Sequence, residues 1–338
     1  MISVESVGVD DPRVVALWRD FDAELERLYG EPDIQAPIAP DGVVASLLAL
    51  GDSGEPVGTV LVRWSRHHPD TPGTVEIRRL YVRPEHRGHG HARVMMGAIE
   101  RAAFRVGATR LVLGTGEAQP EAVALYEGIG YNRIPPFGIY ANYSRALCMA
   151  KSLPTRLLVV NGAIGAGKTA TAAAICDILG DAGVRVAFVD ADALCQARPE
   201  PSNDPYQQHL LMLSLASLAP IYRARGYGCI VVARVVEDPQ DRDRYARAFA
   251  GRVGPAQVSV VRVTAADETR AERIIAREPA GRWRDFGLAR SRELGEVLDS
   301  LDLDDGVVAT DTAPREEVAR QVLDVAGWWV PGAENLAQ

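Results

Sequence analysis

Residues 157–169 read Leu-Leu-Val-Val-Asn-Gly-Ala-Ile-Gly-Ala-Gly-Lys-Thr. The apolar run predicts a buried strand, the glycines predict a tight turn, and Lys168 opens a helix expected to run to about Leu179. The stretch matches Gly-x-x-x-x-Gly-Lys-[Ser/Thr], the phosphate-binding loop (P-loop) pattern, in the strand–loop–helix setting that the pattern requires. Lysine occurs only at positions 151 and 168, so a chance glycine-rich turn is the weaker interpretation.

Each part of this loop has a chemical reason. Glycines allow backbone N–H groups to surround phosphate oxygens, and the lysine reaches the β and γ oxygens as a point charge. The hydroxyl that follows is suited to ligate Mg²⁺. We therefore expect a site for ATP and Mg²⁺ that is formed by Gly162, Ala163, Ile164, Gly165, Ala166, Gly167, Lys168 and Thr169.

Two carboxylates, Asp190 and Asp192, follow a strand expected at residues 184–189. In open α/β sheets, ligands bind beyond the carboxyl ends of the strands. We expect Asp190 to hold Mg²⁺ together with Thr169, and the other aspartate to accept a proton from a substrate hydroxyl. Both aspartates and Lys168 are therefore candidate catalytic residues. The alternative is that either aspartate caps a helix.

The rest of this half alternates short apolar strands with helices, which indicates a parallel sheet covered by helices. Helical sequence is expected over residues 192–225 and, Arg-rich, over 268–298. A strand at 307–309 precedes a last helix that is expected to end near Trp328. No acidic residue ends the strand expected at 229–235, so the usual Walker-B carboxylate is missing.

A second glycine-rich turn lies in the first half of the chain. Residues 76–92 read Glu-Ile-Arg-Arg-Leu-Tyr-Val-Arg-Pro-Glu-His-Arg-Gly-His-Gly-His-Ala, which predicts a strand, a turn and a helix that begins at Gly88 or Gly90. Such glycines let backbone N–H groups approach a pyrophosphate, and the helix N-terminus adds a favourable dipole. Taken alone, the pattern is equally typical of a tight turn before a surface helix.

Other elements of this half are expected from periodicity. Helices are predicted at residues 12–28 and 121–127, and strands at 57–64, 109–114 and 143–149. By the two-residue period of a strand, Glu76 is expected to share a face with Arg78 and Leu80.

From Val57 to Leu153 the chain resembles the GNAT family of N-acetyltransferases. The likeness rests on the strand at 76–82, the Arg87-x-x-Gly90-x-Ala92 turn, and the stretch from Gln119 to Tyr126 followed by Gly130-Tyr131. The family usually has Asn where Gln119 stands. The resemblance implies a mixed α/β sheet and acetyl-CoA as the acyl donor.

The resemblance also implies roles for single residues. Tyr126 would protonate the leaving CoA thiolate, and Glu76 is the candidate base for the acceptor amine. The alternatives are that Tyr126 is a core helix residue and Glu76 a solvated strand carboxylate. The cofactor contacts would be backbone groups of Leu80, Tyr81 and Val82 for the pantetheine arm, Arg87, Gly88, His89, Gly90, His91 and Ala92 for the pyrophosphate, and Gln119.

From Leu157 to about Trp328 the chain resembles small-molecule P-loop kinases, especially the adenylylsulfate-kinase-like group. The likeness rests on the P-loop, residues 189–192, residues 230–233 with Pro239 and Arg242 downstream, and a lid-like segment at 276–282. The residues after Asp192 lack the polar Asn and Arg expected for adenylylsulfate, which puts that substrate in doubt. The candidates for neutralising the transferred phosphate are Arg273, Arg277, Arg282 and Arg284. The alternative is that these arginines only form a solvated helix face.

Length, net charge and composition limit the number of domains, the kinds of partner and the compartment. A length of 338 residues suits about two domains, and the connector Lys151-Ser152-Leu153-Pro154 leads us to expect domains at 1–152 and 155–330. The net charge of −8 makes nucleic acid a poor partner. Isolated cysteines, no signal-peptide pattern and no apolar stretch long enough to cross a membrane favour the cytoplasm.

The leading hypothesis is a bifunctional transferase, which acetylates an amine and phosphorylates a hydroxyl of a small molecule such as an antibiotic or secondary metabolite. A second hypothesis makes the P-loop domain a regulatory ATP-binding or ATPase module. A third treats the first domain as an acyl-CoA sensor without catalysis. No motif names either acceptor.

Overall fold

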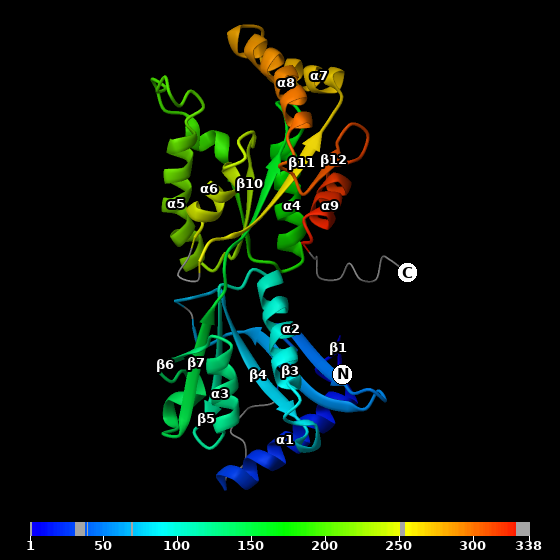
Figure 1. The fold of residues 1–338 in the computed structure, drawn as a ribbon, viewed down its shortest axis with the longest axis vertical. Helices are drawn as coiled ribbons and strands as arrows, with labels where there is room; N and C mark the ends of the chain where they lie inside the picture. The colour runs from blue at the N-terminus through cyan, green and yellow to red at the C-terminus, as the bar shows by residue number, and fades with distance from the viewer. Residues whose placement is uncertain (1, 31–37, 39, 69, 251–253, 329–338) are drawn as a thin grey trace. The chain divides into compact units, whose positions relative to one another are not determined.

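The computed structural model describes residues 2–30, 38, 40–68, 70–250 and 254–328. The chain forms two compact units that divide between Leu153 and Pro154. One unit contains a mixed sheet and the other an all-parallel sheet, both covered by helices (Figure 1), which confirms the expected fold class. Residue 330, the expected end of the second domain, lies outside the described residues. Within the described part, no helix is long and apolar enough to cross a membrane.

A seven-stranded sheet forms the first unit. In spatial order its strands are β1 (Ser3–Ser6), β2 (Val43–Leu50), β3 (Pro56–Trp64), β4 (Thr74–Val82), β5 (Arg110–Gly116), β7 (Ala146–Ser152) and β6 (Asn132–Ile134). Only β4 and β5 run parallel. Strands β1, β2 and β6 have no counterpart among the predicted elements, because β1 and β6 are very short and β2 is an apolar run without a clear period. Strand β7 begins at Ala146, three residues after the expected start.

Helices cover both faces of this sheet. In β2, Leu47 packs in a core with Met95 and Ile99 of α2 (His91–Arg105), whereas the next residue, Leu48, packs with Leu17 of α1 (Pro12–Tyr29). Neighbouring strand residues point to opposite faces, so α1 and α2 lie on opposite sides. The core beneath α2 also holds Tyr126 of α3 (Pro120–Gly128).

A β-bulge interrupts β4 at Arg79, which has a φ of 57°. The register between β3 and β4 shifts there, and Leu80 packs into the same core as Ile77. The expectation that Glu76 shares a face with Leu80 is therefore wrong, because the extra bulge residue reverses the alternation after Arg78. The parallel pairing of β4 with β5 ends at Ile77 and Leu113, although both strands continue.

The second unit is a five-stranded parallel sheet. Its spatial order is β12 (Gly306–Ala309), β11 (Gln257–Thr264), β8 (Arg156–Asn161), β10 (Cys229–Ala233) and β9 (Val186–Asp190). From the central β8, Leu157 and Val159 pack toward α5 (Gln208–Ala224) and α6 (Asp241–Ala248). Leu158 and Val160 pack toward α4 (Lys168–Asp181) and α9 (Arg315–Val325), which ends before the expected Trp328.

Two expected helical stretches are interrupted. After β9 the chain forms the short 3₁₀ helix η3 (Ala191–Cys195) and then a loop, and α5 begins only at Gln208. Three prolines at 199, 201 and 205 explain the break, since proline lacks an N–H donor and restricts the residue before it. The stretch at 268–298 is divided into α7 (Asp267–Arg277) and α8 (Arg282–Ser300) by Pro279 and Gly281.

A buried asparagine joins three segments at the carboxyl end of β8. The Asn161 side chain is fully buried. Its amide oxygen accepts the N–H groups of Gly162 and Val236, both at 2.7 Å, and its Nδ2 donates to the Val236 carbonyl at 3.2 Å and to Asp304 at 2.9 Å. One side chain thus fixes the start of the P-loop against the loops that follow β10 and precede β12.

Replacing Asn161 tests how much its side chain contributes to the stability of the second unit. We expect Asn161→Ala to lower the free energy of unfolding of the second unit by about 2–4 kcal/mol, because it leaves buried donors and an acceptor unsatisfied. The exposed Asn203→Ala is the matched control. Hydrogen exchange should accelerate in peptides from residues 156–190 and stay unchanged in peptides from 91–116. Unchanged exchange in both would show that Asn161 is dispensable.

Candidate functional site

The glycine turn of the first unit leaves helix N–H groups free of side-chain caps. Gly88 and Gly90 have φ values of 80° and 79°, and a Cβ at either position would meet no described atom within 4 Å. Gly90 directly precedes α2 and no side chain caps that helix. The first N–H groups of α2 are therefore available to an anion, as a pyrophosphate requires. The turn contains all six residues expected there, from Arg87 to Ala92.

Arg87 supports this turn rather than extending from it. Its Nε donates to the Val82 carbonyl at 2.8 Å, and Nη2 pairs with Glu24 of α1 at 2.7 Å. The guanidinium carbon also lies 5.7 Å from the Tyr81 ring centroid. Backbone N–H groups, and not the Arg87 charge, thus make the anion cradle in this conformation.

An open strand edge lies beside the cradle. Since the ladder between β4 and β5 ends at Ile77, residues 80–82 pair only with β3 among the described strands. Their other backbone groups face the space into which β4 and β5 diverge. Leu80, Tyr81 and Val82 can therefore offer strand-like hydrogen bonds to the amide groups of an extended arm.

Glu76 is a buried carboxylate at the point where the strands diverge. Only 4% of the residue is exposed, so it is not a solvated strand carboxylate. Burial raises the pKa of Glu76, while the charges of Arg78, His67 and Arg63 oppose that rise; the Arg78 Nε lies 3.8 Å from Oε1. A carboxyl pKa raised toward neutrality suits a general base.

Tyr126 lies in α3, and Gln119 directly precedes that helix. Burial alone raises the pKa of Tyr126 above its usual range, so the phenol keeps its proton at neutral pH. The residue is also part of the core, next to Tyr131 at a ring distance of 5.9 Å. The Gln119 amide oxygen accepts the Thr115 hydroxyl at 3.0 Å and the Gly116 N–H at 3.3 Å, which closes the turn before α3.

In the second unit, four carbonyl groups of the P-loop accept hydrogen bonds from side chains, three of which lie outside the loop. A trans peptide directs the following N–H away from each carbonyl, so the N–H groups of Ile164, Gly165 and Gly167 point the opposite way. The bonds are Ser291 Oγ to the Ile164 carbonyl (2.7 Å), Arg273 Nη1 to Gly165 (3.2 Å), Thr310 Oγ1 to Ala166 (3.0 Å) and, within the loop, Lys168 Nζ to Ala163 (3.1 Å).

The glycines of this loop are required by close packing as well as by φ. At Gly162 a Cβ would lie 2.3 Å from the Val263 carbonyl oxygen, and at Gly165 it would lie 2.7 Å from that of Arg270. Gly167, at φ 97°, directly precedes α4, which has no side-chain cap. The loop is therefore a second backbone anion cradle at a helix N-terminus.

Lys168 lies in an environment that disfavours its charge. Burial lowers its pKa to about 8; Asp192 and Asp190 oppose this change, and Arg234 and Arg277 add to it. A bound polyphosphate would supply the missing negative charge and raise the lysine pKa again.

The two aspartates after β9 have different surroundings. Asp190 Oδ1 accepts the N–H of Asp192 at 3.2 Å and caps η3, as the helix-capping alternative predicts. Asp192 is mostly exposed, and Oδ1 pairs with Arg234 at 2.5 Å. Arg234 directly follows β10, the strand that lacks the usual Walker-B carboxylate at its end. Its only sequence signal is a basic residue at the carboxyl end of a central strand.

The lid arginines also differ. Arg273 donates to the Gly165 carbonyl at 3.2 Å and to the Thr310 carbonyl at 2.7 Å, so it holds the loop. Its expected role in neutralising phosphate stays a prediction. Arg277 is exposed beside Glu278 and acts on the Lys168 pKa, which places it near the loop. Arg282 is exposed at the start of α8 and Arg284 is half-buried.

Thr169 and Asp190, the residues expected to hold Mg²⁺, suit an ion that has few protein ligands. Thr169 is exposed on the first turn of α4, and Asp190 ends β9. In the described part of the chain, no three His, Cys, Asp or Glu side chains gather into a metal cluster. Mg²⁺ usually keeps several waters and binds through one or two protein oxygens plus substrate phosphates, which this pair can provide.

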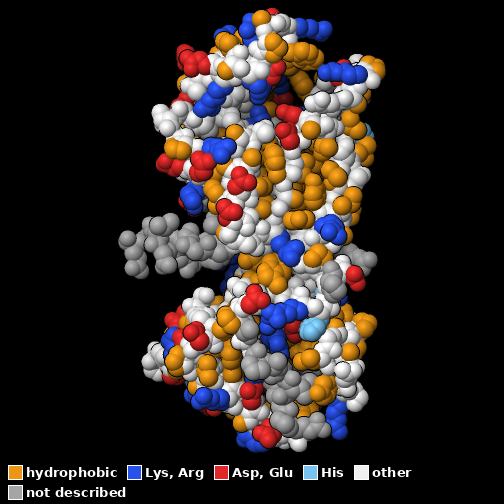
Figure 2. Space-filling model, turned by 180° about the vertical axis from the view of Figure 1, so that it is seen from behind, with side chains coloured by type: hydrophobic (Ala, Val, Ile, Leu, Met, Phe, Trp, Pro, Cys, Tyr) orange, Lys and Arg blue, Asp and Glu red, His pale blue; other side chains and the backbone are white. Residues whose placement is uncertain are grey.

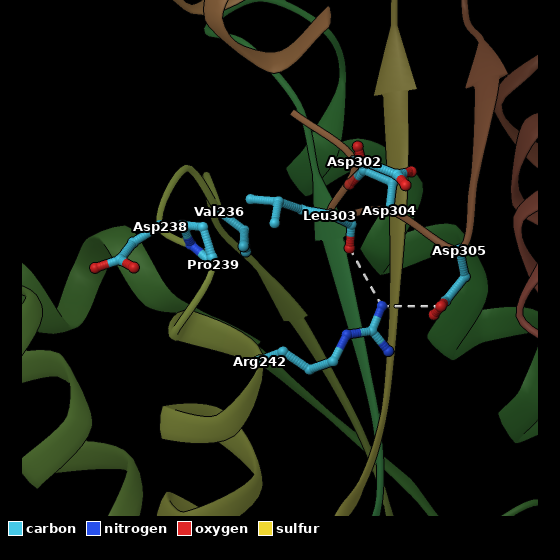
Figure 3. A pocket seen from close by; sticks show the side chains of 8 residues that line it. All are labelled: Val236, Asp238, Pro239, Arg242, Asp302, Leu303, Asp304 and Asp305. Atoms are coloured by element: carbon cyan, nitrogen blue, oxygen red, sulfur yellow. Dashed lines mark hydrogen bonds and ion pairs between the residues drawn. The ribbon is translucent and has the colours of Figure 1, made fainter. Parts of the chain in front are cut away.

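A cavity of about 300 Å³ lies beside the loops that Asn161 joins (Figure 3). In it, Arg242 Nη2 donates to the Leu303 carbonyl at 3.2 Å and to Asp305 at 2.8 Å. Arg242, quoted above for the kinase resemblance, thus joins α6 to the loop that precedes β12. The lining residues are Val236, Asp238, Pro239, Arg242, Asp302, Leu303, Asp304 and Asp305.

Comparison with known proteins identifies the family of the first unit and finds a domain model that matches the second. The acetyltransferase (GNAT) family model matches residues 14–131, and an AAA domain model matches residues 157–300. The IAA acetyltransferase of Azospirillum brasilense is 32% identical over 146 residues, which cover 41% of this chain and 90% of that protein. An uncharacterised N-acetyltransferase of Schizosaccharomyces pombe is 33% identical over 99 residues, 29% of this chain and 56% of its own length.

Solved structures of acetyltransferases also align with 45% of the chain. The IAA acetyltransferase from Bacillus cereus is 18% identical over its full length (100%), with a TM-score of 0.34. A phosphinothricin acetyltransferase from Sinorhizobium meliloti, solved with AcCoA, is 15% identical over 88% of its length, with a TM-score of 0.33.

The lowered lysine pKa gives the P-loop a testable pH dependence. Below pH 8 Lys168 already carries its charge, whereas above pH 8 it must take up a proton when a polyphosphate binds. We expect the affinity for Mg·ATP to fall above pH 8, by up to about tenfold per pH unit. Calorimetry at pH 7 and pH 9 in buffers of different ionisation enthalpy should detect proton uptake only at pH 9. Equal proton uptake at both values would contradict the assignment, and Lys168→Arg is the control.

Proposed function

Because this chain belongs, through residues 14–131, to the GNAT family of acetyltransferases and carries a P-loop AAA domain in its second unit, we propose that it is a bifunctional transferase. Its first unit would transfer an acetyl group from acetyl-CoA to the amine of a small molecule. Its second unit would transfer the γ-phosphoryl group of Mg·ATP to the hydroxyl of a small molecule. An antibiotic or another secondary metabolite with both groups would be one such acceptor.

One observation carries this proposal. Each unit has a helix that begins directly after a left-handed glycine, Gly90 or Gly167, without a side-chain cap. Each unit also holds a group able to move a proton: Glu76 of β4 near the end of its pairing with β5, and Asp192 after β9. Each unit thus combines an anion cradle with an acid–base side chain, which group transfer requires.

For the acetyl transfer, acetyl-CoA supplies a thioester. Glu76, directly or through water, accepts a proton from the acceptor ammonium, and the resulting amine attacks the thioester carbonyl. The C–S bond breaks as the N–C bond forms, the Tyr126 phenol donates its proton to the departing thiolate, and the new amide nitrogen releases its second proton to water. Residues 80–82 and the Gly88–Gly90 turn hold the donor in place.

For the phosphoryl transfer, the acceptor hydroxyl oxygen attacks the γ-phosphorus and Asp192 accepts its proton. The bond between the γ-phosphorus and the β,γ-bridging oxygen breaks, and ADP leaves. Lys168 and the loop N–H groups stabilise charge on the phosphate oxygens. Thr169 and Asp190 would hold Mg²⁺, and Arg277 and Arg282 are the lid cations that remain exposed.

A second candidate function is favoured by Arg234. This cation follows β10 and pairs with Asp192 at 2.5 Å, an arrangement that occupies the carboxylate proposed as base. The P-loop unit would then bind or slowly hydrolyse ATP and regulate acetylation. ATP would change the kinetics of acetyl transfer in this case, and identical kinetics with and without ATP would exclude it.

The acetyl-transfer mechanism predicts separate effects on chemistry and binding. We expect Tyr126→Phe to lower kcat by about 10²-fold or more, because it removes the general acid, while acetyl-CoA binding measured by calorimetry changes little. With Glu76→Gln the rate should also fall, and the parent rate should decline at low pH as the raised Glu76 pKa is crossed. Lys168→Ala should leave acetylation intact. Unchanged kcat in Tyr126→Phe would leave a structural role for this residue.

The phosphoryl-transfer mechanism predicts that Asp192→Asn slows transfer at least 10²-fold with little change in Mg·ATP affinity. The exposed Asp181→Asn, at the far end of α4, is the control. Labelled ATP and a panel of alcohols would measure the transfer. If the parent releases only inorganic phosphate with every alcohol, the kinase assignment fails and the regulatory function is favoured.

A further inference from the structure

Three aromatic side chains are exposed near the P-loop. Trp283 is 62% exposed, Tyr206 47% and Phe286 46%. Trp283 and Phe286 lie on the first turns of α8, and Tyr206 ends the loop between η3 and α5. Figure 2 shows hydrophobic side chains among Lys and Arg side chains at this end of the second unit. Exposed aromatic groups that gather in this way mark a binding surface more often than isolated ones do.

Cations and carboxylates hold these rings in place. The Arg198 guanidinium lies 5.3 Å from the Trp283 ring centroid, and Phe286 meets Trp283 edge-on at 6.3 Å. Arg290 lies 5.0 Å from the Tyr206 ring and is itself fixed by Glu237 at 2.6 Å. The loop and α8 therefore contact each other through Arg198 and Trp283, and the rings are ordered before any ligand binds.

The same segments are anchored to the reacting groups. The Tyr206 carbonyl accepts a hydrogen bond from Arg234 Nη2 at 2.9 Å, and Nη1 of the same guanidinium pairs with Asp192. On the other side, Ser291 of α8 donates to the Ile164 carbonyl of the P-loop at 2.7 Å. One guanidinium thus joins Tyr206 to Asp192, and one hydroxyl joins α8 to the loop proposed to hold the phosphates.

The geometry points to an aromatic alcohol as the phosphoryl acceptor, with its ring against Trp283 and Tyr206 and its hydroxyl directed to Asp192. This inference rests on the proposed phosphotransferase function of the second unit. The hydroxyl oxygen forms the new bond to the γ-phosphorus, Asp192 takes the proton, and ADP leaves with the electrons of the broken P–O bond. The exposed rings of Trp283 and Tyr206 would contact the π face of the acceptor, which a saturated ring of similar size does not offer.

The test uses the full-length protein, γ-labelled ATP with Mg²⁺, and three acceptor alcohols. 2-Phenylethanol and 2-(indol-3-yl)ethanol are compared with 2-cyclohexylethanol, which has the same hydroxyl arm without a π face. We expect label on the aromatic alcohols, with kcat/KM at least tenfold above that of the saturated one. Equal transfer to the saturated alcohol, or transfer to it alone, would overturn the inference.

Substitutions then test whether the ring of the acceptor alcohol binds against Trp283 and Tyr206. Trp283→Ala and Tyr206→Ala should each raise KM for the aromatic alcohol about tenfold with little change in kcat or in KM for ATP, and Tyr206→Phe should restore the parent value. Leu213→Ala, at an equally exposed apolar residue of α5, is the control. A rise in KM for ATP instead would assign the rings to the nucleobase and overturn the inference.

Two measurements separate this inference from the proposed function. If calorimetry shows no Mg·ATP binding, or if no alcohol receives label, the phosphotransferase function fails and the inference fails with it. If label reaches alcohols without preference for a π face and Trp283→Ala has no effect, the phosphotransferase stands and only the aromatic acceptor is rejected.

Discussion

A left-handed glycine directly before a helix is the constraint on which both sites depend. At Gly90 and Gly167 the chain turns with φ of 79° and 97° into α2 and α4, and neither helix receives a side-chain cap. Side chains with a Cβ rarely adopt that backbone conformation. The uncapped turn leaves several N–H groups without partners, which is unfavourable until an anion binds. Each unit therefore contains a helix N-terminus that can accept an anion.

The two cradles are supported in different ways. In the first unit, Arg87 of the turn itself binds back to the Val82 carbonyl and to Glu24. In the second unit, the support comes from side chains far away in sequence, Ser291, Arg273 and Thr310, which bind successive loop carbonyls. A rearrangement of α7 or α8 would therefore change the P-loop directly, whereas the first cradle depends on α1 and β4.

Burial acts on the acid–base groups of both units in the same direction, toward their neutral forms. It raises the pKa of Glu76 and Tyr126 and lowers the pKa of Lys168 to about 8. A buried carboxylate whose pKa is raised accepts a proton more readily, and a buried phenol can donate one. A buried lysine near its pKa responds strongly to a phosphate. Desolvation is thus the largest cause of the pKa shifts of these three groups in two different folds.

Local sequence determined the glycine loops, the elements on either side of them and the fold class of each unit, because turn conformation and hydrophobic period are properties of adjacent residues. The P-loop and both aspartates could be named in this way, whereas Glu76 and Tyr126 were named from the resemblance to the GNAT family. Tertiary structure decided what local pattern cannot contain. The bulge at Arg79 moves Leu80 to the other face, prolines divide two expected helices, and Arg273 binds a P-loop carbonyl instead of lying on a solvated helix face. Arg234, Ser291 and Thr310 gain their roles only because strands and helices distant in sequence end at one edge of a parallel sheet.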